Sequence, residues 1–376
     1  INLNMKNFIH RKRSKASAKN FLTIVAIAPI IIISLVFQSC HLFTNDELIT
    51  IYDWKTDNPN NQGLNSIVLD EAVSKAGDLD FIHSLLIIKN DRLVVEEYYN
   101  DHFIYDYFNM ASATKSVMST LIGIALDGGY LTSVDQKVLS FFPEHTITAA
   151  DSLKQKITIK HLLTMTAGIP GDNSWEVLNI GDSGLIAGIL DLNLINAPGE
   201  RFTYSSSQTH LLSAILTRAT GLNTKTFAEY NLLTPLGIDI DFWDKDFSGV
   251  YYGSTGIYAK SRNFARLGQL FLHDGKIGDQ QIISKAWIEQ ATSDQTHRVG
   301  RIMGEIKKVN YGYNWWVGEL DSYKCYYAYG YGGQFMFCFP ELNMIIVTTA
   351  DIPTYRPGNE NKIISLISEY ILSSVQ

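Results

Sequence analysis

Residues 112–115 read Ser-Ala-Thr-Lys, a Ser-x-x-Lys pattern that could carry nucleophilic chemistry. Positions i and i+3 lie on one face of a helix, so the amine of Lys115 can reach the hydroxyl of Ser112. A serine hydroxyl needs an adjacent base to act as a nucleophile, and burial favours the neutral amine that can be this base. Free N–H groups at a helix N-terminus also suit a developing oxyanion. Taken alone, the pattern is more typical of a helix-capping serine followed by a surface lysine.

Two further segments contain residue types that fit the same chemistry. Tyr204 lies in the turn-like segment 198–206, just before an expected helix, where a tyrosine can carry a proton during the reaction. Residues 329–334 read Tyr-Gly-Tyr-Gly-Gly-Gln and open an expected strand. Consecutive glycines at the start of a strand let a substrate lie close to the backbone. A packing tyrosine and a plain glycine turn are the alternative interpretations.

Other common catalytic patterns do not occur in the sequence. It has no Gly-x-Ser-x-Gly, His-Glu-x-x-His or Cys-x-x-Cys segment and no phosphate-binding loop, and its nine histidines are scattered. His161, within an expected helix, is interpreted as a structural residue. The sequence therefore implies no metal and no other cofactor.

The order of these segments, Ser-x-x-Lys, then Tyr-x-Ser, then Tyr-x-Gly, resembles the serine β-lactamase and penicillin-binding-protein superfamily. It is most similar to the branch with class C β-lactamases, esterases and 6-aminohexanoate-dimer hydrolases. Residues 157–169 and 264–270 match as well, and the resemblance covers residues 75–375. It implies an α/β (α+β) fold of the β-lactamase/transpeptidase type. In that fold an antiparallel sheet flanked by helices adjoins a mostly helical lobe, with the active site between them.

The resemblance also assigns catalytic roles to the matching residues. Ser112 would be the nucleophile and Lys115 its general base, while Tyr204 would share proton transfer to the leaving group. The oxyanion hole would be formed by the backbone N–H groups of Ser112 and Gln334. The implied reaction is acylation of Ser112 followed by hydrolysis of the acyl-enzyme.

The residues that the resemblance places against the substrate are Ser206, Tyr331, Gly332 and Gly333, and two of them depart from the family pattern. Ser206 stands where the family commonly has an asparagine, and its shorter hydroxyl reaches a substrate amide less well. Tyr331 stands where the family commonly has a lysine, so it offers no charge to a substrate carboxylate. Both departures favour an esterase or amidase acting on less charged substrates over a β-lactamase or D-alanyl-D-alanine carboxypeptidase.

Hydrophobic periodicity predicts the elements that position these segments. Residues 84–89 and 93–98, and again residues 335–339 and 344–349, read as β-hairpins, while residues 359–375 have apolar side chains at helical spacing. The pattern between the hairpins is largely helical, so one sheet is expected to contain both ends of the domain. The helices expected there span residues 112–127, 158–165, 207–219, 263–272 and 284–291.

These elements define a serine hydrolase domain over residues 76–376. Its sheet lobe is expected over residues 76–111 and 250–376, and its helical lobe over residues 112–249. Residues 41–75 are expected to form an irregular N-terminal wrap around it.

Two local features leave alternatives open. Asp172, Asn173 and Trp175 follow a turn and could line the cleft, but a solvated loop is the favoured interpretation. Cys325 and Cys338 lie symmetrically about the glycine-rich turn, so that a cross-strand disulfide and two buried thiols are both compatible with the sequence.

The composition is typical of a globular protein, because 46% of the 376 residues are apolar and 18% are charged. The formal charge of −7 is unevenly distributed, since the first 45 residues contain six basic residues and no acidic one. The remainder is therefore strongly acidic, which argues against a nucleic-acid-binding face.

The N-terminal residues resemble an export signal. A basic stretch ending at Lys19 precedes the apolar run 21–37, and Cys40 follows directly after Ser39. These are the parts of a secretory signal, and the cysteine resembles the lipidated residue of a bacterial lipoprotein. An uncleaved anchor helix is the alternative, since the run is near the lower limit for a membrane span. Residues 1–40 are thus expected to export the domain and tether it to the membrane.

Two classes of function are compatible with the sequence. The first is an exported serine hydrolase that acts on a small ester, amide or peptide substrate through an acyl-enzyme on Ser112. The second is a non-catalytic module that binds a cell-wall peptide or a protein partner. Because Ser112, Lys115 and Tyr204 fill all three nucleophile and proton-transfer positions, the sequence favours the enzyme.

Overall fold

The computed structural model describes residues 53–376, apart from residues 147–148, 182–183, 297–298, 300–302 and 353–355. The chain divides into two compact units, Ile1–Thr50 and Ile51–Gln376, and the described residues belong to the second. The apolar run 21–37 and Cys40 lie outside the described residues. Within the described ranges, no helix combines the length and the apolar character that crossing a membrane requires.

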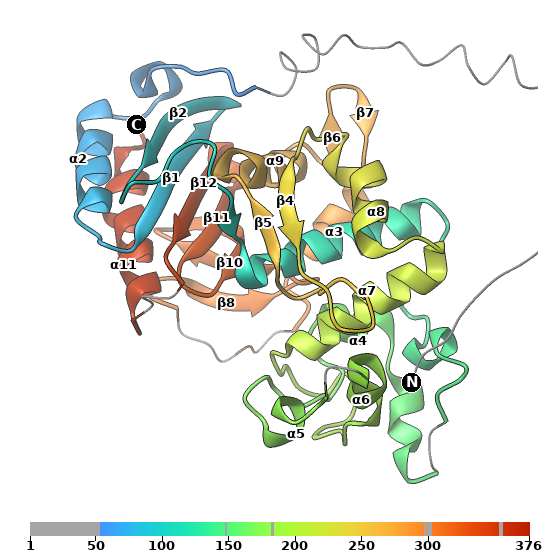
Figure 1. Ribbon diagram of the computed structural model, residues 1–376. Helices are drawn as coiled ribbons and strands as arrows, with labels where there is room; N and C mark the ends of the chain where they lie inside the picture. Colours follow the sequence, from blue (N-terminus) through green and yellow to red (C-terminus); the bar gives the residue numbers. More distant parts are fainter. Residues whose placement is uncertain (1–52, 147–148, 182–183, 297–298, 300–302, 353–355) are drawn as a thin grey trace, which may run out of the picture. The chain divides into compact units, whose positions relative to one another are not determined.

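A seven-stranded sheet, in which all neighbouring strands are antiparallel, forms the centre of the second unit (Figure 1). The early and late parts of the domain meet in this sheet, because its first strand in the chain, β1, pairs with its last, β12. The two expected hairpins are confirmed as β1–β2 and β11–β12. In spatial order the strands are β2 (Arg92–Tyr98), β1 (Ile82–Lys89), β12 (Met344–Ala350), β11 (Gln334–Phe339), β10 (Tyr323–Gly330), β9 (Trp316–Leu320) and β8 (Lys307–Tyr311).

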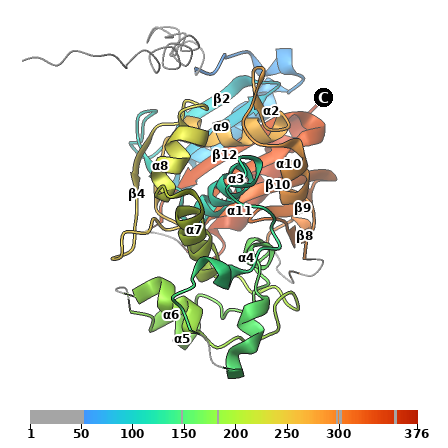
Figure 2. The ribbon, with the colours of Figure 1, turned by 90° about the vertical axis from the view of Figure 1, so that its right-hand side faces the viewer.

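Helices cover both faces of this sheet (Figures 1 and 2). On one face α9 (Ser261–Leu272) packs against β1, β11 and β12, and on the other lie α2 (Ser66–Gly77) and α11 (Asn359–Leu366). Successive side chains of a strand point to opposite faces, so Ile345 of β12 joins one hydrophobic core and Ile346 joins the other. The central strands β11 and β12 are therefore buried on both sides.

The remaining elements form the helical lobe and a small second sheet. That sheet has the order β3 (Phe108–Asn109), β5 (Ile257–Ala259), β4 (Ile240–Trp243), and β6 (Lys276–Ile277) pairs with β7 (Gln280–Gln281). Every expected helix is present within a few residues of its expected ends. The helices are α3 (Thr114–Asp127), preceded by the 3-10 turn η2 (Ala111–Ala113), and α4 (Ile159–Leu163), α5 (Trp175–Leu178), α6 (Leu185–Asp191), α7 (Ser206–Thr220), α8 (Thr224–Ala228) and α10 (Lys285–Ala291).

The N-terminal wrap differs from the sequence expectation. Residues Ser66–Gly77 form the regular helix α2, capped by the side chain of Asn65, so the prediction of irregular structure is wrong for this part. Leu69 and Ala72 of α2 are buried against the sheet, which explains why this segment is ordered. Among the described residues of the expected wrap, 53–65 follow an irregular path with the short 3-10 turn η1 (Pro59–Gln62), and Thr56 forms a bridge with Leu93 there.

Cys325 and Cys338 are buried free thiols, so the disulfide alternative is wrong. The two cysteines lie on the neighbouring strands β10 and β11, but the residue opposite Cys338 is Tyr326. Their side chains join the cores on opposite faces of the sheet, which separates the sulfur atoms. Burial raises the pKa of the Cys325 thiol to about 12, so it stays protonated at neutral pH.

Candidate active site

Ser112 lies in the turn that leads into α3. Its neighbours Ala111 and Ala113 are buried, whereas Ser112 is partly exposed. Ala111 has a φ of 46°, an uncommon conformation for a residue with a side chain, and its N–H donates to Asn109 Oδ1 at 2.8 Å. Strained backbone of this kind is often retained at functional sites. The turn therefore presents the Ser112 hydroxyl at the surface of an otherwise buried segment.

Lys115 is almost completely buried, with 1% of its surface exposed, and its amine has three polar neighbours. Lys115 Nζ lies 3.1 Å from Ser112 Oγ, as the i, i+3 spacing predicts. It also lies 3.2 Å from Ser206 Oγ and 3.0 Å from the carbonyl oxygen of Ser254. Ser206 is the first residue of α7, and Ser254 lies in the loop between β4 and β5. Three separate segments therefore meet at the amine.

The hydrogen atoms around Lys115 can be assigned from these contacts. Ser206 Oγ donates to Asp172 Oδ2 at 2.9 Å, so toward the lysine Ser206 acts as an acceptor. The carbonyl oxygen of Ser254 can only accept. In the role of general base, a neutral amine would have two N–H groups for Ser206 and Ser254 and one lone pair for the hydroxyl of Ser112.

Tyr204 covers the other side of the lysine. Its ring centroid lies 4.9 Å from Lys115 Nζ. The ring stacks on Trp316 with a centroid distance of 5.8 Å and meets Tyr311 edge to face. Packing on β8 and β9 thus fixes the ring, and Tyr204 lines the same cleft as Ser112. The structure brings together Ser112, Lys115 and Tyr204, the three residues to which the family resemblance assigns nucleophile and proton-transfer roles.

A cleft of about 580 Å³ opens over these residues. Tyr331 is 49% exposed at its rim, while the hydroxyl of Tyr329 donates to the buried carboxylate of Glu360 at 2.5 Å. Among the described residues that line it, Asp172 is the only charged one. The lining residues are Ser112, Gly171, Asp172, Asn173, Ser174, Tyr204, Tyr329 and Tyr331.

The other predicted substrate and oxyanion residues lie around the cleft rather than in its lining. Gln334 is fully buried, and its side-chain amide binds both backbone groups of Ala350, at 2.6 and 3.1 Å. Gly332 and Gly333 form the turn between β10 and β11 with φ values of 93° and 114°, which glycine adopts most easily. Ser206 contacts the lysine instead of the cleft. The oxyanion role of the Gln334 N–H stays a prediction.

Sequence reasoning named Asp172 and Asn173 only as the less favoured alternative for the cleft, and it missed Ser254. Asp172 contacts Ser206 and lines the cleft together with Asn173, so the cleft alternative holds for both, although Asn173 is also exposed to solvent. Trp175 is 76% exposed and is not among the lining residues. Ser254 contributes its backbone carbonyl, which no residue type could reveal. For Asp172, the sequence signal is the turn that precedes it.

Comparisons with known proteins identify the family of this chain. The sequence profile described as Beta-lactamase matches residues 84–363. The 6-aminohexanoate-dimer hydrolase of Paenarthrobacter ureafaciens is 22% identical over 281 residues, which are 69% of this chain and 70% of that protein. An uncharacterised protein of Alkalihalophilus pseudofirmus is 23% identical over 290 residues, 70% of this chain and 82% of that protein.

Solved structures share the fold. A provisionally assigned β-lactamase from Bacteroides dorei matches with a TM-score of 0.68 and 20% identity, over 83% of this chain and 99% of that one. A provisionally assigned 6-aminohexanoate-dimer hydrolase from Bacillus anthracis matches with a TM-score of 0.65 and 18% identity, over 88% and 94%. The profile match spans most of the chain and shows that the chain belongs to the β-lactamase family, within the serine β-lactamase and penicillin-binding-protein superfamily.

Proposed function

We propose that this protein is an exported serine hydrolase, tethered to the membrane, that hydrolyses esters or amides through an acyl-enzyme on Ser112. The observation that carries the proposal is the contact of the buried Lys115 amine with Ser112 Oγ at 3.1 Å, with its other two polar contacts directed at Ser206 and Ser254. Family membership supports a hydrolase.

The proposed reaction begins when Lys115 takes the proton of Ser112 while the serine oxygen attacks the substrate carbonyl carbon. The carbonyl oxygen becomes an oxyanion near the backbone N–H of Ser112. Collapse of the tetrahedral intermediate expels the alcohol or amine, which receives a proton by way of Tyr204. A water molecule then gives a proton to Lys115 as its oxygen attacks the acyl carbon. The bond between this carbon and Ser112 Oγ breaks, the carboxylic acid is released, and Ser112 takes the proton back from Lys115. No cofactor takes part in these steps.

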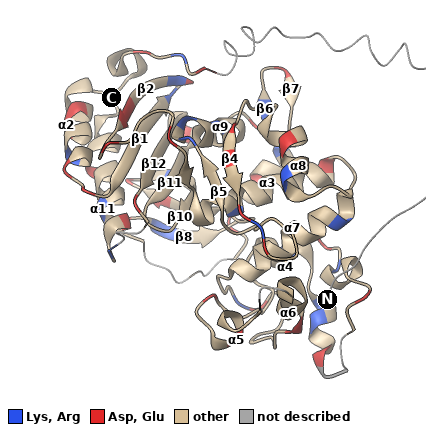
Figure 3. Ribbon diagram, viewed as in Figure 1, with Lys and Arg blue, Asp and Glu red and all other residues tan. Residues whose placement is uncertain are grey.

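The composition of the cleft supports substrates without a carboxylate near the scissile bond. Among its described lining residues there is no Lys or Arg, and the one charged side chain is the acid Asp172. Tyr331 lies at the rim, where a lysine would pair with an anionic substrate. Around the fold, basic and acidic residues are interspersed rather than gathered on one side in the view of Figure 3, which is in keeping with a small-molecule substrate.

A substrate panel tests this assignment. We expect measurable hydrolysis of neutral p-nitrophenyl esters and anilides, with lower kcat/KM for the matching esters that bear a carboxylate. Tyr331→Lys should raise turnover of the carboxylate-bearing series, and Tyr331→Phe is the matched control. A wild-type preference for β-lactams or for peptides ending in D-alanine would instead support the β-lactamase or carboxypeptidase alternative.

The non-catalytic alternative and the tether have separate tests. A folded protein that hydrolyses no member of the panel would support a module that binds cell-wall peptide or a protein partner.

Membrane tethering through Cys40 predicts that cells incorporate labelled palmitate into the wild type and not into Cys40→Ser. Membrane association without palmitate would favour an uncleaved anchor at residues 1–40.

A further inference from the structure

The loop between β4 and β5 forms a hairpin-like arm over residues 244–256. Its base is closed by hydrogen bonds from Asp244 N to Gly256 O and from Tyr252 N to Asp244 O, both 2.9 Å. Its tip is closed by a bond from Asp246 N to Val250 O at 2.8 Å. The arm bears Ser254, whose carbonyl oxygen accepts from Lys115. What holds the arm therefore affects where this acceptor lies.

Asp246 organises the tip of the arm. Its side chain is completely buried, and Oδ1 accepts hydrogen bonds from the Ser248 N–H, the Ser248 hydroxyl and the Val250 N–H, at 2.9, 2.7 and 2.9 Å. Burial alone would raise the pKa of this carboxyl, but the bonds from Ser248, His210 and Val250 outweigh it and lower the pKa. The carboxylate of Asp246 thus stays charged inside the protein, and its hydrogen-bond donors stabilise this buried charge.

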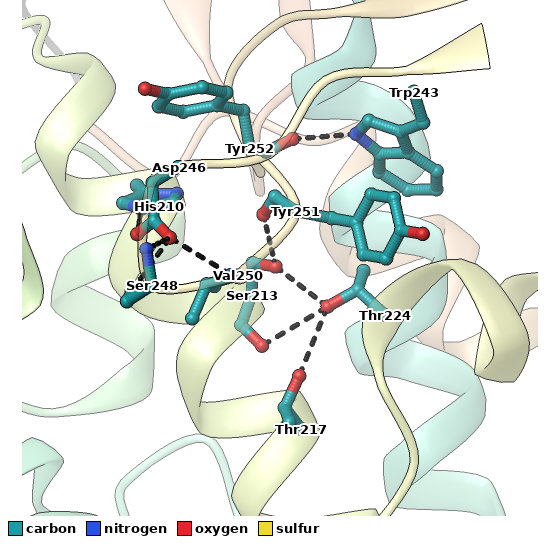
Figure 4. Close-up of polar contacts among 10 residues, drawn as sticks. All are labelled: His210, Ser213, Thr217, Thr224, Trp243, Asp246, Ser248, Val250, Tyr251 and Tyr252. Atoms are coloured by element: carbon teal, nitrogen blue, oxygen red, sulfur yellow. Dashed lines mark hydrogen bonds and ion pairs between the residues drawn. The ribbon is translucent and has the colours of Figure 1, made fainter. Parts of the chain in front are cut away.

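The second carboxylate oxygen attaches the arm to α7. His210 is 2% exposed, and its Nε2 lies 2.9 Å from Asp246 Oδ2 (Figure 4). Burial lowers the pKa of His210, although the bond to Asp246 opposes this effect. The ring is therefore neutral at physiological pH and donates its Nε2 hydrogen. His210 lies about one turn after Ser206 on the same helix.

Further contacts fix the arm directly before the acceptor, Ser254. Ser213 Oγ donates to the Tyr251 carbonyl oxygen at 2.6 Å, and Trp243 Nε1 donates to the Tyr252 carbonyl oxygen at 2.8 Å (Figure 4). At Gly253 the backbone approaches α7 so closely that a Cβ would lie 2.0 Å from the Thr209 carbonyl oxygen. The arm is thus held from residue 246 to residue 253, directly before Ser254.

We propose that His210 and Asp246 are positioning residues for the general base. They touch neither the cleft nor the nucleophile, and they act by fixing the Ser254 carbonyl against Lys115. Helix α7 then positions both acceptors of the lysine hydrogens. It contains Ser206, and through His210 it holds the arm that carries Ser254. If Ser254 moves away, one N–H loses its partner, and the lone pair of the amine no longer has a single preferred direction toward Ser112. This inference rests on the proposed role of Lys115 as a base.

His210→Ala tests the proposal most gently, because it removes the tether and leaves the three bonds within the arm to Asp246 Oδ1. His210→Gln is the rescue variant, since its amide can donate to Asp246. His273→Ala is the matched control, because His273 Nε2 lies 2.9 Å from Asp91 Oδ1 in a comparable pair that is partly exposed to solvent. Two quantities are measured, the rate of labelling by a fluorophosphonate probe and the ¹³Cε resonance of Lys115, assigned with Lys115→Ala.

The proposal predicts that His210→Ala labels on the order of 10-fold more slowly, as expected for a displaced catalytic group, with a shifted Lys115 resonance. His210→Gln and His273→Ala should match the wild type in both. A His210→Ala protein with the wild-type rate and resonance would overturn the proposal, and so would a His210→Gln protein as impaired as His210→Ala.

Two further outcomes are covered by the same design. Should His210→Ala not fold, Ser213→Ala replaces it, since it removes the bond to the Tyr251 carbonyl together with the contact between Ser213 Oγ and Thr224 Oγ1. A shifted Lys115 resonance supports the proposal and an unchanged one overturns it. If the wild type is not labelled at all, the proposed function fails. The resonance comparison between His210→Ala and His210→Gln still decides whether the pair positions Lys115.

Discussion

Ser206 is bound twice by Asp172, with its N–H 2.6 Å from Oδ1 and its hydroxyl 2.9 Å from Oδ2. The first bond also satisfies a free N–H group at the start of α7. Because both bonds join the same two residues, they fix the direction of the Ser206 hydroxyl hydrogen. Lys115 therefore meets a lone pair of Ser206 and can direct its own lone pair to Ser112.

We predict that Asp172→Asn lowers kcat for a neutral p-nitrophenyl ester by about 10-fold to 100-fold with a smaller effect on KM, because an amide cannot accept both Ser206 bonds. Glu176→Gln, a change of an exposed acid on α5, should leave kcat unchanged. Steady-state kinetics on proteins of matched circular dichroism check this. An unchanged kcat for Asp172→Asn would show that Asp172 does not orient Ser206.

Tyr204→Phe removes the hydroxyl of Tyr204 and keeps its aromatic ring. The ring should keep its stacking on Trp316, so the melting temperature should stay near that of the wild type. Loss of the proton carrier should lower kcat by about 100-fold, which is typical of general acid–base groups. Kinetics and thermal unfolding on the same samples test both statements. Near-normal activity in Tyr204→Phe would assign leaving-group protonation to another group.

Gly330→Ala tests the contact between the end of β10 and the turn that presents the nucleophile. A Cβ at Gly330 would lie 2.2 Å from the Met110 carbonyl oxygen and 3.1 Å from Ala111 Cβ. The backbone must move to relieve this overlap, which should cost about 1–3 kcal/mol of unfolding free energy and reduce activity. Gly181→Ala, where a Cβ would meet no atom within 4 Å, is the control. Urea denaturation should give nearly equal stabilities for Gly181→Ala and the wild type.

His83 should make stability depend on pH. Burial, together with the nearby His102, lowers the pKa of His83 from 6.5 to about 4. The unfolded chain therefore binds a proton at this position before the folded protein does, so His83 contributes full stability above pH 6.5 and loses it as pH falls toward 4. We expect His83→Gln to show a smaller drop in unfolding free energy between about pH 7.5 and about pH 5. An equal drop in both proteins would contradict this assignment.

The sequence predicts the parts of the fold that have clear periodicity or turn signals. The β1–β2 and β11–β12 hairpins and the helices α3, α7 and α9 lie close to their expected positions. It does not predict β10 as a strand, because six consecutive residues of this strand are buried, so the usual alternation of polar and apolar residues is missing. Nor does it predict α2. Only Leu69, Ala72 and Ala76 of this helix are buried, so its hydrophobic periodicity is weak.

Within the site, the sequence identifies the residues whose chemistry depends on type and local spacing. Ser112 and Lys115 are neighbours on one helix, so their contact follows from helical geometry. The contacts of Asp172 with Ser206 and of Ser254 with Lys115 depend on how distant segments pack, and Ser254 uses a group that every residue has. Spacing alone therefore cannot find either of them.

The most direct test of the account is the identity of the serine that a fluorophosphonate probe modifies in the protein truncated to begin after Cys40. Ser112→Ala, Lys115→Ala and the wild type are treated in parallel, and the modified peptide is identified by mass spectrometry. We predict a single adduct on Ser112 in the wild type and no adduct in either variant. A folded wild type that forms no adduct, or one modified on another serine, would contradict the central claim that Lys115 activates Ser112.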